Sequence, residues 1–235
     1  MRRWRHRTER SLLEQDGRPL GFTWNYSRGE MLADGVVHAV GVVLGSAGAL
    51  ALVLLALHST GTVQIASALI YAAGLVAVFG LSAAYNLWPV SPCKWLLRRF
   101  DHSAIYLMIA GTYTPFLLQM KASFVSSGLL AAVWLTAGIG IALKLLLPGR
   151  LDRLSIGLYV ILGWSGIVAY DVLFTLPPST LALLVAGGAL YSVGVVFHTW
   201  QGLRFQNVVW HGFVLIAALC HYFAVLETVA LATPG

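Results

Sequence analysis

The chain has 235 residues, of which 58% are hydrophobic and only 10% are charged, and its formal net charge is +6. Soluble domains carry about 25% charged and about 45–50% apolar residues, so this composition excludes an ordinary water-soluble domain. Seven of the fifteen Lys and Arg residues precede residue 30 and most others lie in short connections, a distribution that sets membrane topology and does not indicate a nucleic-acid partner.

Residues 1–29 are rich in arginine and contain no apolar stretch of the kind found in a cleavable signal peptide. We expect this segment to be a basic cytosolic arm that touches anionic lipid headgroups. Residues 30–235 then form the membrane domain, and the first apolar helix directs its insertion.

An apolar helix of about 20 residues crosses the roughly 30 Å hydrocarbon core of a bilayer. Seven such stretches follow one another, separated by short turns rich in Gly, Pro and Ser. We therefore predict an all-α fold, a seven-transmembrane helix bundle. The predicted spans are 35–57, 62–88, 102–120, 124–147, 154–176, 180–200 and 208–231.

The loop charges predict the orientation of this bundle. Fourteen of the fifteen Lys and Arg residues fall on the side of the amino-terminal arm, and only Lys121 falls on the other. Because basic loops stay in the cytoplasm, we expect the amino terminus to be cytoplasmic. Seven spans then place the carboxyl terminus outside, in an integral, multi-pass protein of a bacterial cytoplasmic membrane.

Polar side chains gather near the predicted cytoplasmic ends of the spans. Such groups are costly in a membrane and are therefore typical of functional sites. Residues four apart share one helix face, and three pairs have this spacing: Asp34 and His38, Ser82 and Asn86, and Asn207 and His211.

Two further helices contribute polar groups at the same depth. Asp101 and His102 are expected to open the third span, and His198 to close the sixth. Together with the three pairs they predict a polar cavity open toward the cytoplasm. Two structural alternatives remain open: that Ser82 hydrogen-bonds only its own helix, and that Asp101 caps its helix and pairs with Arg98 or Arg99.

Three segments carry a family resemblance. Residues 96–116 read LLRRFDHSAIYLMIAGTYTPF, residues 210–215 read WHGFVL, and Glu30, Asp34 and His38 precede Gly41 at fixed spacing. These motifs resemble the hemolysin III family, related to the progestin and adipoQ receptors and to alkaline ceramidase-like proteins. The resemblance covers about residues 28–228.

The resemblance implies a zinc ion held by three histidines, with Ser82 and Asp101 completing a catalytic site, as in related proteins that cleave ceramide-type amides. At the implied ligand positions, however, this chain has Asn86 and Asn207, and only His211 remains. Carboxamides are weak zinc ligands. We therefore expect no cofactor at that site, and a zinc ion only at a site rearranged around His211, Asp101, Asp34, His38, His102 or His198.

Three functions follow from these patterns. The first is a non-hydrolytic, receptor-like or membrane-homeostasis protein whose partners are membrane lipids and which takes a lipid or fatty-acid ligand. The second is a metal-dependent lipid amidase or other hydrolase with a rearranged zinc site. The third, a cytolytic pore or channel, requires a continuous polar lining, whereas the outer halves of the spans are almost entirely apolar.

Overall fold

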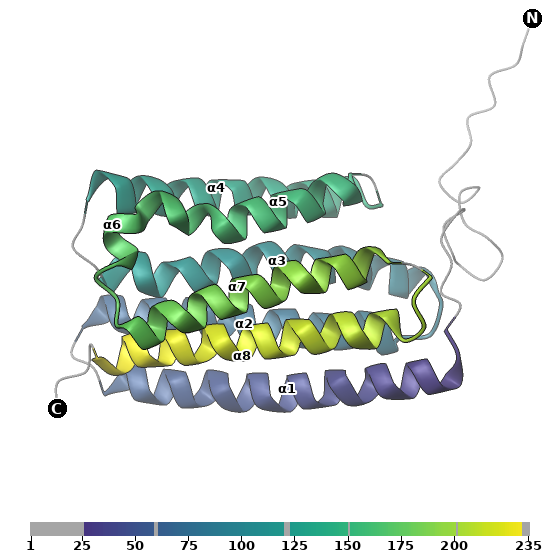
Figure 1. Ribbon diagram of the computed structural model, residues 1–235. Coiled ribbons are helices and arrows are strands. Elements are labelled where there is room, and N and C mark those ends of the chain that lie inside the picture. The colour runs from purple at the N-terminus through teal and green to yellow at the C-terminus, as the bar shows by residue number, and fades with distance from the viewer. Residues whose placement is uncertain (1–25, 59–60, 120–122, 150, 201, 232–235) are drawn as a thin grey trace, which may run out of the picture.

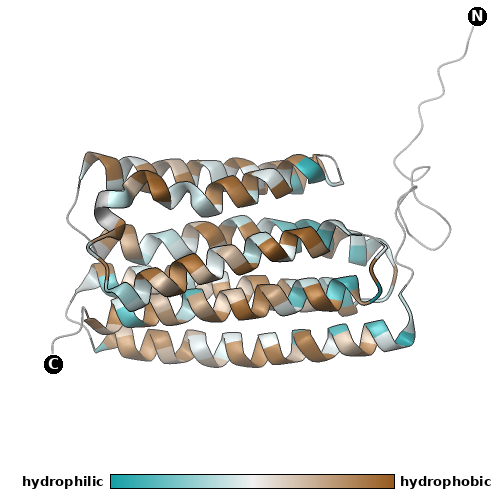
Figure 2. Ribbon diagram, in the orientation of Figure 1, coloured by the Kyte–Doolittle hydropathy of each residue, from teal (hydrophilic) through white to brown (hydrophobic). Residues whose placement is uncertain are grey.

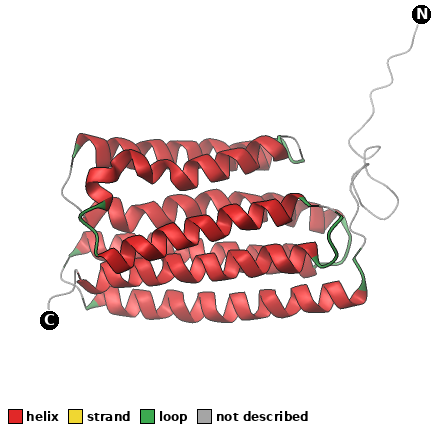
Figure 3. Ribbon diagram, viewed as in Figure 1, coloured by secondary structure: helices red, strands yellow, loops and turns green. Residues whose placement is uncertain are grey.

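A computed structural model describes residues 26–58, 61–119, 123–149, 151–200 and 202–231. Most of the predicted basic arm, up to residue 25, lies outside these ranges. Within these ranges the chain consists of helices joined by short loops and turns (Figures 1 and 3). Its elements are α1 (Arg28–Leu57), α2 (Thr62–Leu87), α3 (Pro92–Gln119), α4 (Phe124–Leu146), α5 (Asp152–Trp164), the 3-10 helix η2 (Ser165–Ala169), α6 (Tyr170–Leu173), α7 (Pro178–Thr199) and α8 (Gln206–Leu231).

The long helices form one bundle in which α1 packs against α2 and α8, α3 packs against α2 and α4, and α7 packs against α8. Six of the described helical segments are long and apolar enough to cross a membrane: α1, α2, α4, α5 with η2, α7 and α8. The segment α3 is as long as these and lies alongside them, but its polar side chains lower its hydropathy (Figures 1 and 2). The protein is therefore an all-helical, multi-pass membrane protein.

One end of the bundle contains the start of α1, the end of α2, the start of α3, the α4–α5 connection and the α7–α8 connection (Figure 1). We call it the basic end, because Lys94, Arg98 and Arg204 lie in these segments and Lys144 lies in the last turn of α4. Hydrophilic residues concentrate there in Figure 2. The end of α8 lies at the opposite end of the bundle from the start of α1.

The third helix begins ten residues earlier than predicted, at Pro92 rather than at residue 102. Because its first turns are charged, the sequence predicts a loop there. In the structure Lys94 Nζ donates hydrogen bonds to the carbonyl oxygens of Tyr85, Asn86 and Trp88, at 2.9–3.0 Å. The lysine thereby satisfies carbonyls at the end of α2, which a helix leaves without intrahelical partners.

The prediction that Asp101 and His102 open the third helix is consequently wrong, since both lie well inside α3. The alternative in which Asp101 pairs with Arg98 or Arg99 also fails in the structure. Arg98 forms its ion pair with Asp152, at 2.8 Å, and Arg99 donates to a backbone carbonyl of α4.

The fifth span, predicted as one helix over 154–176, is interrupted by η2. The hydroxyl of Tyr113 accepts a hydrogen bond from the backbone N–H of Gly166, at 2.7 Å, and lies 3.0 Å from the carbonyl oxygen of Leu162. A side chain of α3 thus takes the place of the regular hydrogen bonds between successive turns.

Glycines allow α1 and α2 to approach closely. A Cβ atom on Gly45 would lie 2.6 Å from Cδ2 of Phe79, and one on Gly41 would lie 2.9 Å from Cδ1 of the same ring. Both glycines and the phenyl ring are buried. This contact holds the first two helices together and fixes the rotation of α1 that directs Asp34 and His38 inward.

Candidate metal centre

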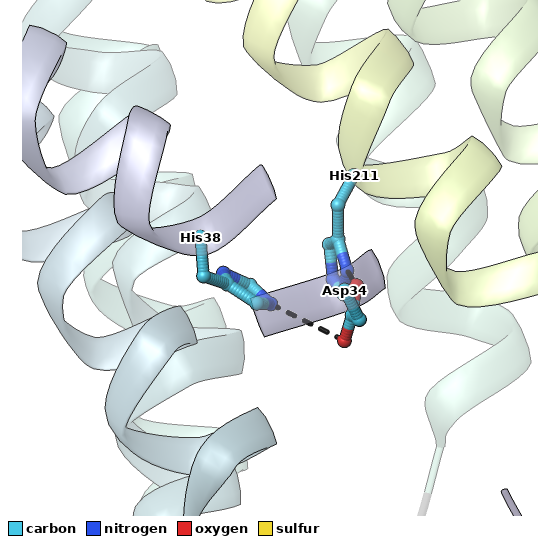
Figure 4. Close-up of side chains that lie close together, drawn as sticks. All are labelled: Asp34, His38 and His211. Carbon is cyan, nitrogen blue, oxygen red and sulfur yellow. Dashed lines mark hydrogen bonds and ion pairs between the residues drawn. The ribbon is translucent and has the colours of Figure 1, made fainter. Parts of the chain in front are cut away.

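Two turns of α1 and one turn of α8 bring three ligand-type side chains together at the basic end. Asp34 Oδ1 lies 2.7 Å from Nδ1 of His211, and Asp34 Oδ2 lies 3.5 Å from Nε2 of His38. The two imidazole rings are 4.4 Å apart between centroids. Figure 4 shows both rings directed at the carboxylate of Asp34.

The cluster is buried. Asp34 is 8% exposed and His38 is 4% exposed, while His211 is half-buried. Among the described residues, the Nε2 atom of His38 makes no regular hydrogen bond, and the carboxylate of Asp34 lies 3.5 Å from it as an ion-pair partner. A buried polar atom without a close partner costs about 1–3 kcal/mol, and the long ion pair with Asp34 offsets part of that cost.

A cavity of about 140 Å³ reaches the cluster from the basic end. Asp34 lies on its wall, together with Asn86 and Asn207, and Glu30 lies closer to the start of α1. The other lining residues are Tyr26, Met31, Leu87, Lys94, Leu203, Phe205, Gln206 and Val208.

Glu30 holds the rim of this cavity in place. Its carboxylate accepts hydrogen bonds from the backbone and hydroxyl of Ser27, at 2.8 and 2.7 Å, in the capping box that begins α1. It also accepts one from the backbone N–H of Phe205, at 3.0 Å, which fastens the α7–α8 connection to α1. All these bonds use the ionised carboxylate, so Glu30 serves as a structural anchor.

A second polar group lies between α2 and α3. Asp101 is 8% exposed. Its Oδ2 atom lies 3.1 Å from Nδ1 of His102, and its carboxylate accepts a hydrogen bond from Ser82. The Nδ2 atom of Asn86 donates to the carbonyl oxygen of Ser82 at 2.9 Å and approaches its hydroxyl at 3.3 Å. Asn86 is therefore bonded to its own helix.

The remaining predicted residues lie around these two groups. The ring of His198 packs against Trp210, 4.9 Å between centroids, and its backbone carbonyl accepts a hydrogen bond from Gln206. Asn207 hydrogen-bonds the phenol of Tyr26, whose pKa is raised by its partial burial. The structure thus places His198 beside α8, and Asn207 in the cavity wall rather than in a ligand cluster.

The residues at the zinc positions implied by the resemblance do not fit a zinc ion. Asn86 directs its amide N–H, a donor that cannot ligate a cation, at Ser82. Asn207 bonds Tyr26. Within the described ranges, the one group of three His, Cys, Asp or Glu side chains at metal-ligand spacing is Asp34, His38 and His211.

The sequence predicts that these residues lie at a common depth in the membrane. It does not predict that Asp34 contacts His211. The two are 177 positions apart, and their contact depends on α1 and α8 being neighbours. The one available signal was that both lie on i,i+4 stripes at the same predicted level of the membrane.

Comparison with known proteins gives a consistent result. The family model described as "Haemolysin-III related" matches residues 29–222. The chain is 34% identical over 198 residues to the hemolysin-3 homolog of Bacillus subtilis (strain 168), covering 84% of this chain and 93% of that protein. It is 36% identical over 201 residues to hemolysin-3 of Bacillus cereus, covering 84% and 90%. It is 29% identical over 165 residues to the human monocyte to macrophage differentiation factor, covering 68% of each chain.

Proposed function

Because the chain belongs to the hemolysin III family, which is related to the progestin and adipoQ receptors, we propose that it is a non-hydrolytic member of this group. In this proposal it has a receptor-like or membrane-homeostasis role in a bacterial cytoplasmic membrane. Its ligand is a membrane lipid or a fatty acid.

The observation that carries the proposal is the chemistry at positions 86 and 207. Both are carboxamides, and the side chain of Asn86 is engaged by Ser82. A hydrolytic zinc site needs ligands that hold the ion firmly and leave one position for a water molecule. Carboxamides that are bonded to neighbouring side chains do not supply such a ligand set.

The nearby carboxylates also lack the freedom that a general base requires. Asp101 is engaged by His102 and Ser82, and Glu30 by Ser27 and Phe205. A general base has to reach the attacking water within hydrogen-bond distance and accept its proton. Carboxylates held by two or three donors are stabilised as anions and are poor proton acceptors.

The membrane topology belongs to the same proposal: seven spans, with the amino terminus in the cytoplasm and the carboxyl terminus outside. The distribution of Lys and Arg supports this orientation. The length of α3 and its place beside the other helices support counting it as a span, despite its lower hydropathy.

A panel of acyl-amide and ester lipids tests the proposal. The purified full-length chain, supplied with zinc, is expected to release no fatty acid above the level of a protein-free control. The panel should include a ceramide, an N-acyl-ethanolamine and a phospholipid. Chelator-sensitive release from any of them would contradict the non-hydrolytic role.

A second function is favoured by one specific observation, the grouping of Asp34, His38 and His211. Two histidines and one carboxylate form the ligand set of several zinc hydrolases. This candidate, a metal-dependent lipid hydrolase with a rearranged site, predicts that His211→Ala and Asp101→Ala each abolish lipid cleavage. Cleavage that persists in both variants would count against it.

A further inference from the structure

We propose that Asp34, His38 and His211 bind one divalent transition-metal ion, with zinc the best match, and that this ion joins α1 to α8. The inference concerns metal binding alone and does not depend on whether the protein hydrolyses lipids.

The first step is the spacing of the donor atoms. One ligand atom from each of the three side chains lies within 4.8 Å of the other two. Ligand atoms bound at about 2.0–2.1 Å to a tetrahedral zinc ion lie about 3.3 Å apart. The carboxylate of Asp34 meets His211 through Oδ1, at 2.7 Å, and His38 through Oδ2, at 3.5 Å, so each histidine already faces a carboxylate oxygen at a similar distance. Rotations of the side chains that bring one donor atom from each residue to the spacing of zinc ligands would enclose an ion.

The second step concerns the buried Nε2 atom of His38, which has a long ion pair with Asp34 in place of a hydrogen bond. This residue is 4% exposed, and its Nε2 lies 3.5 Å from Oδ2 of Asp34, an ion pair that is longer than a normal hydrogen bond (Figure 4). A structural histidine in a membrane bundle normally satisfies both ring nitrogens with donors or acceptors on neighbouring helices. A metal ion would give this lone pair a closer partner.

The third step is the choice of metal. Two imidazoles and one carboxylate suit zinc and other late first-row ions, whereas magnesium and calcium prefer all-oxygen sites. The single negative charge of Asp34 leaves a bound divalent ion with one positive charge in excess. The cavity, with the carboxylate of Glu30 among its lining residues, gives the ion a polar route from the basic end.

The fourth step is the connection that the ion would make. Asp34 and His38 are on α1 and His211 is on α8, and these helices already pack against each other. Occupancy would therefore fix the rotation of α1 against α8 beside the wall of the cavity. The ion would thereby stiffen the wall of the cavity, on which Asp34 lies.

The experiment measures zinc binding to the full-length chain, purified in detergent with a tag that contains no histidine and stripped of metal. We expect one zinc ion per chain by titration calorimetry, and no measurable binding of magnesium. His38→Asn, Asp34→Asn and His211→Asn should each weaken zinc binding by at least about 100-fold, because each removes one of three ligands.

Two matched controls locate the site. His58→Asn changes an exposed histidine of the same helical hairpin, and His102→Asn removes the imidazole bonded to Asp101. Both should bind zinc as the wild type does. If His102→Asn weakens binding as strongly as His38→Asn does, the ion lies at Asp101 and the inference is overturned.

Cobalt substitution of the unaltered protein guards against variants that fail to fold. Cobalt in a four-coordinate site of two imidazoles and a carboxylate gives intense visible absorption, and we expect this absorption to disappear when zinc is added. A wild-type protein that binds neither ion overturns the inference and leaves the non-hydrolytic proposal standing. Zinc binding accompanied by lipid cleavage that His38→Asn abolishes would overturn that proposal and support the inference.

Discussion

Lys144 illustrates at the scale of a single residue how this protein places charge in its bundle. Its side chain is 3% exposed, and its Nζ lies 2.7 Å from Asp152 Oδ1. The other carboxylate oxygen of Asp152 lies 2.8 Å from the guanidinium of Arg98. One acid at the start of α5 thus pairs with two bases, on α3 and α4.

Asp152→Asn is expected to lower the free energy of unfolding by about 1–3 kcal/mol, because it leaves the ammonium of Lys144 buried without a counter-charge. This value includes a reduction for the partial exposure of Asp152, which water screens. Thermal unfolding in detergent, followed by circular dichroism, measures the loss. Adding Lys144→Met to the variant should recover part of the stability, and a double variant less stable than Asp152→Asn would contradict the explanation.

The same scale shows what residue patterns can predict. The i,i+4 spacing of Asp34 and His38 correctly predicted that they share a face, and they form an ion pair in the structure. It could not predict that His211 completes the cluster, because that contact depends on which helices are neighbours. The charges of Lys94 and Arg98 suggested a loop, whereas tertiary contacts with α2 and α5 stabilise them within a helix.

At the scale of elements, the glycines of α1 decide how closely two helices pack. Gly45→Ala should destabilise the protein by about 1–3 kcal/mol, because the new Cβ would lie 2.6 Å from the buried ring of Phe79 and force it to move. Thermal unfolding again provides the measurement.

Gly138→Ala is the matched control, since a Cβ atom at this exposed position of α4 meets nothing within 4 Å. An alanine inside a helix is favoured over glycine by about 0.5–1 kcal/mol, so this variant should lose no stability. Equal losses in the two variants would show that contact with Phe79 is not the cause.

Element boundaries were predictable where apolar runs decide them and failed where side chains from another helix intervene. The second, fourth, sixth and seventh spans match described helices closely, and the first ends as predicted but begins seven residues earlier, at Arg28. The fifth does not, because Tyr113 of α3 bonds the backbone at Gly166 and interrupts the helix. No local pattern in residues 154–176 contains that information.

At the scale of the whole molecule, the number of spans determines where the chain ends. Seven spans place the two termini on opposite sides of the membrane, whereas six would place them on the same side. The first residue of α1 and the last residue of α8 lie at opposite ends of the bundle (Figure 1). We therefore expect a green fluorescent protein fused to the amino terminus to fluoresce in the cytoplasm.

An alkaline phosphatase fused to the carboxyl terminus should correspondingly be active, because that enzyme folds only outside the cytoplasm. A fusion after residue 148, in the α4–α5 connection at the basic end, is the control and should be inactive. Activity at residue 148 together with inactivity at the carboxyl terminus would reverse the proposed orientation.

We propose that a divalent metal ion binds between α1 and α8 rather than at the carboxamides of positions 86 and 207. X-ray diffraction from zinc-soaked crystals, recorded on both sides of the zinc absorption edge, locates the ion directly. The account predicts one anomalous peak about 2.0–2.2 Å from ligand atoms of Asp34, His38 and His211. A peak between Asn86, Asn207 and His211, or no peak at the basic end, would contradict it.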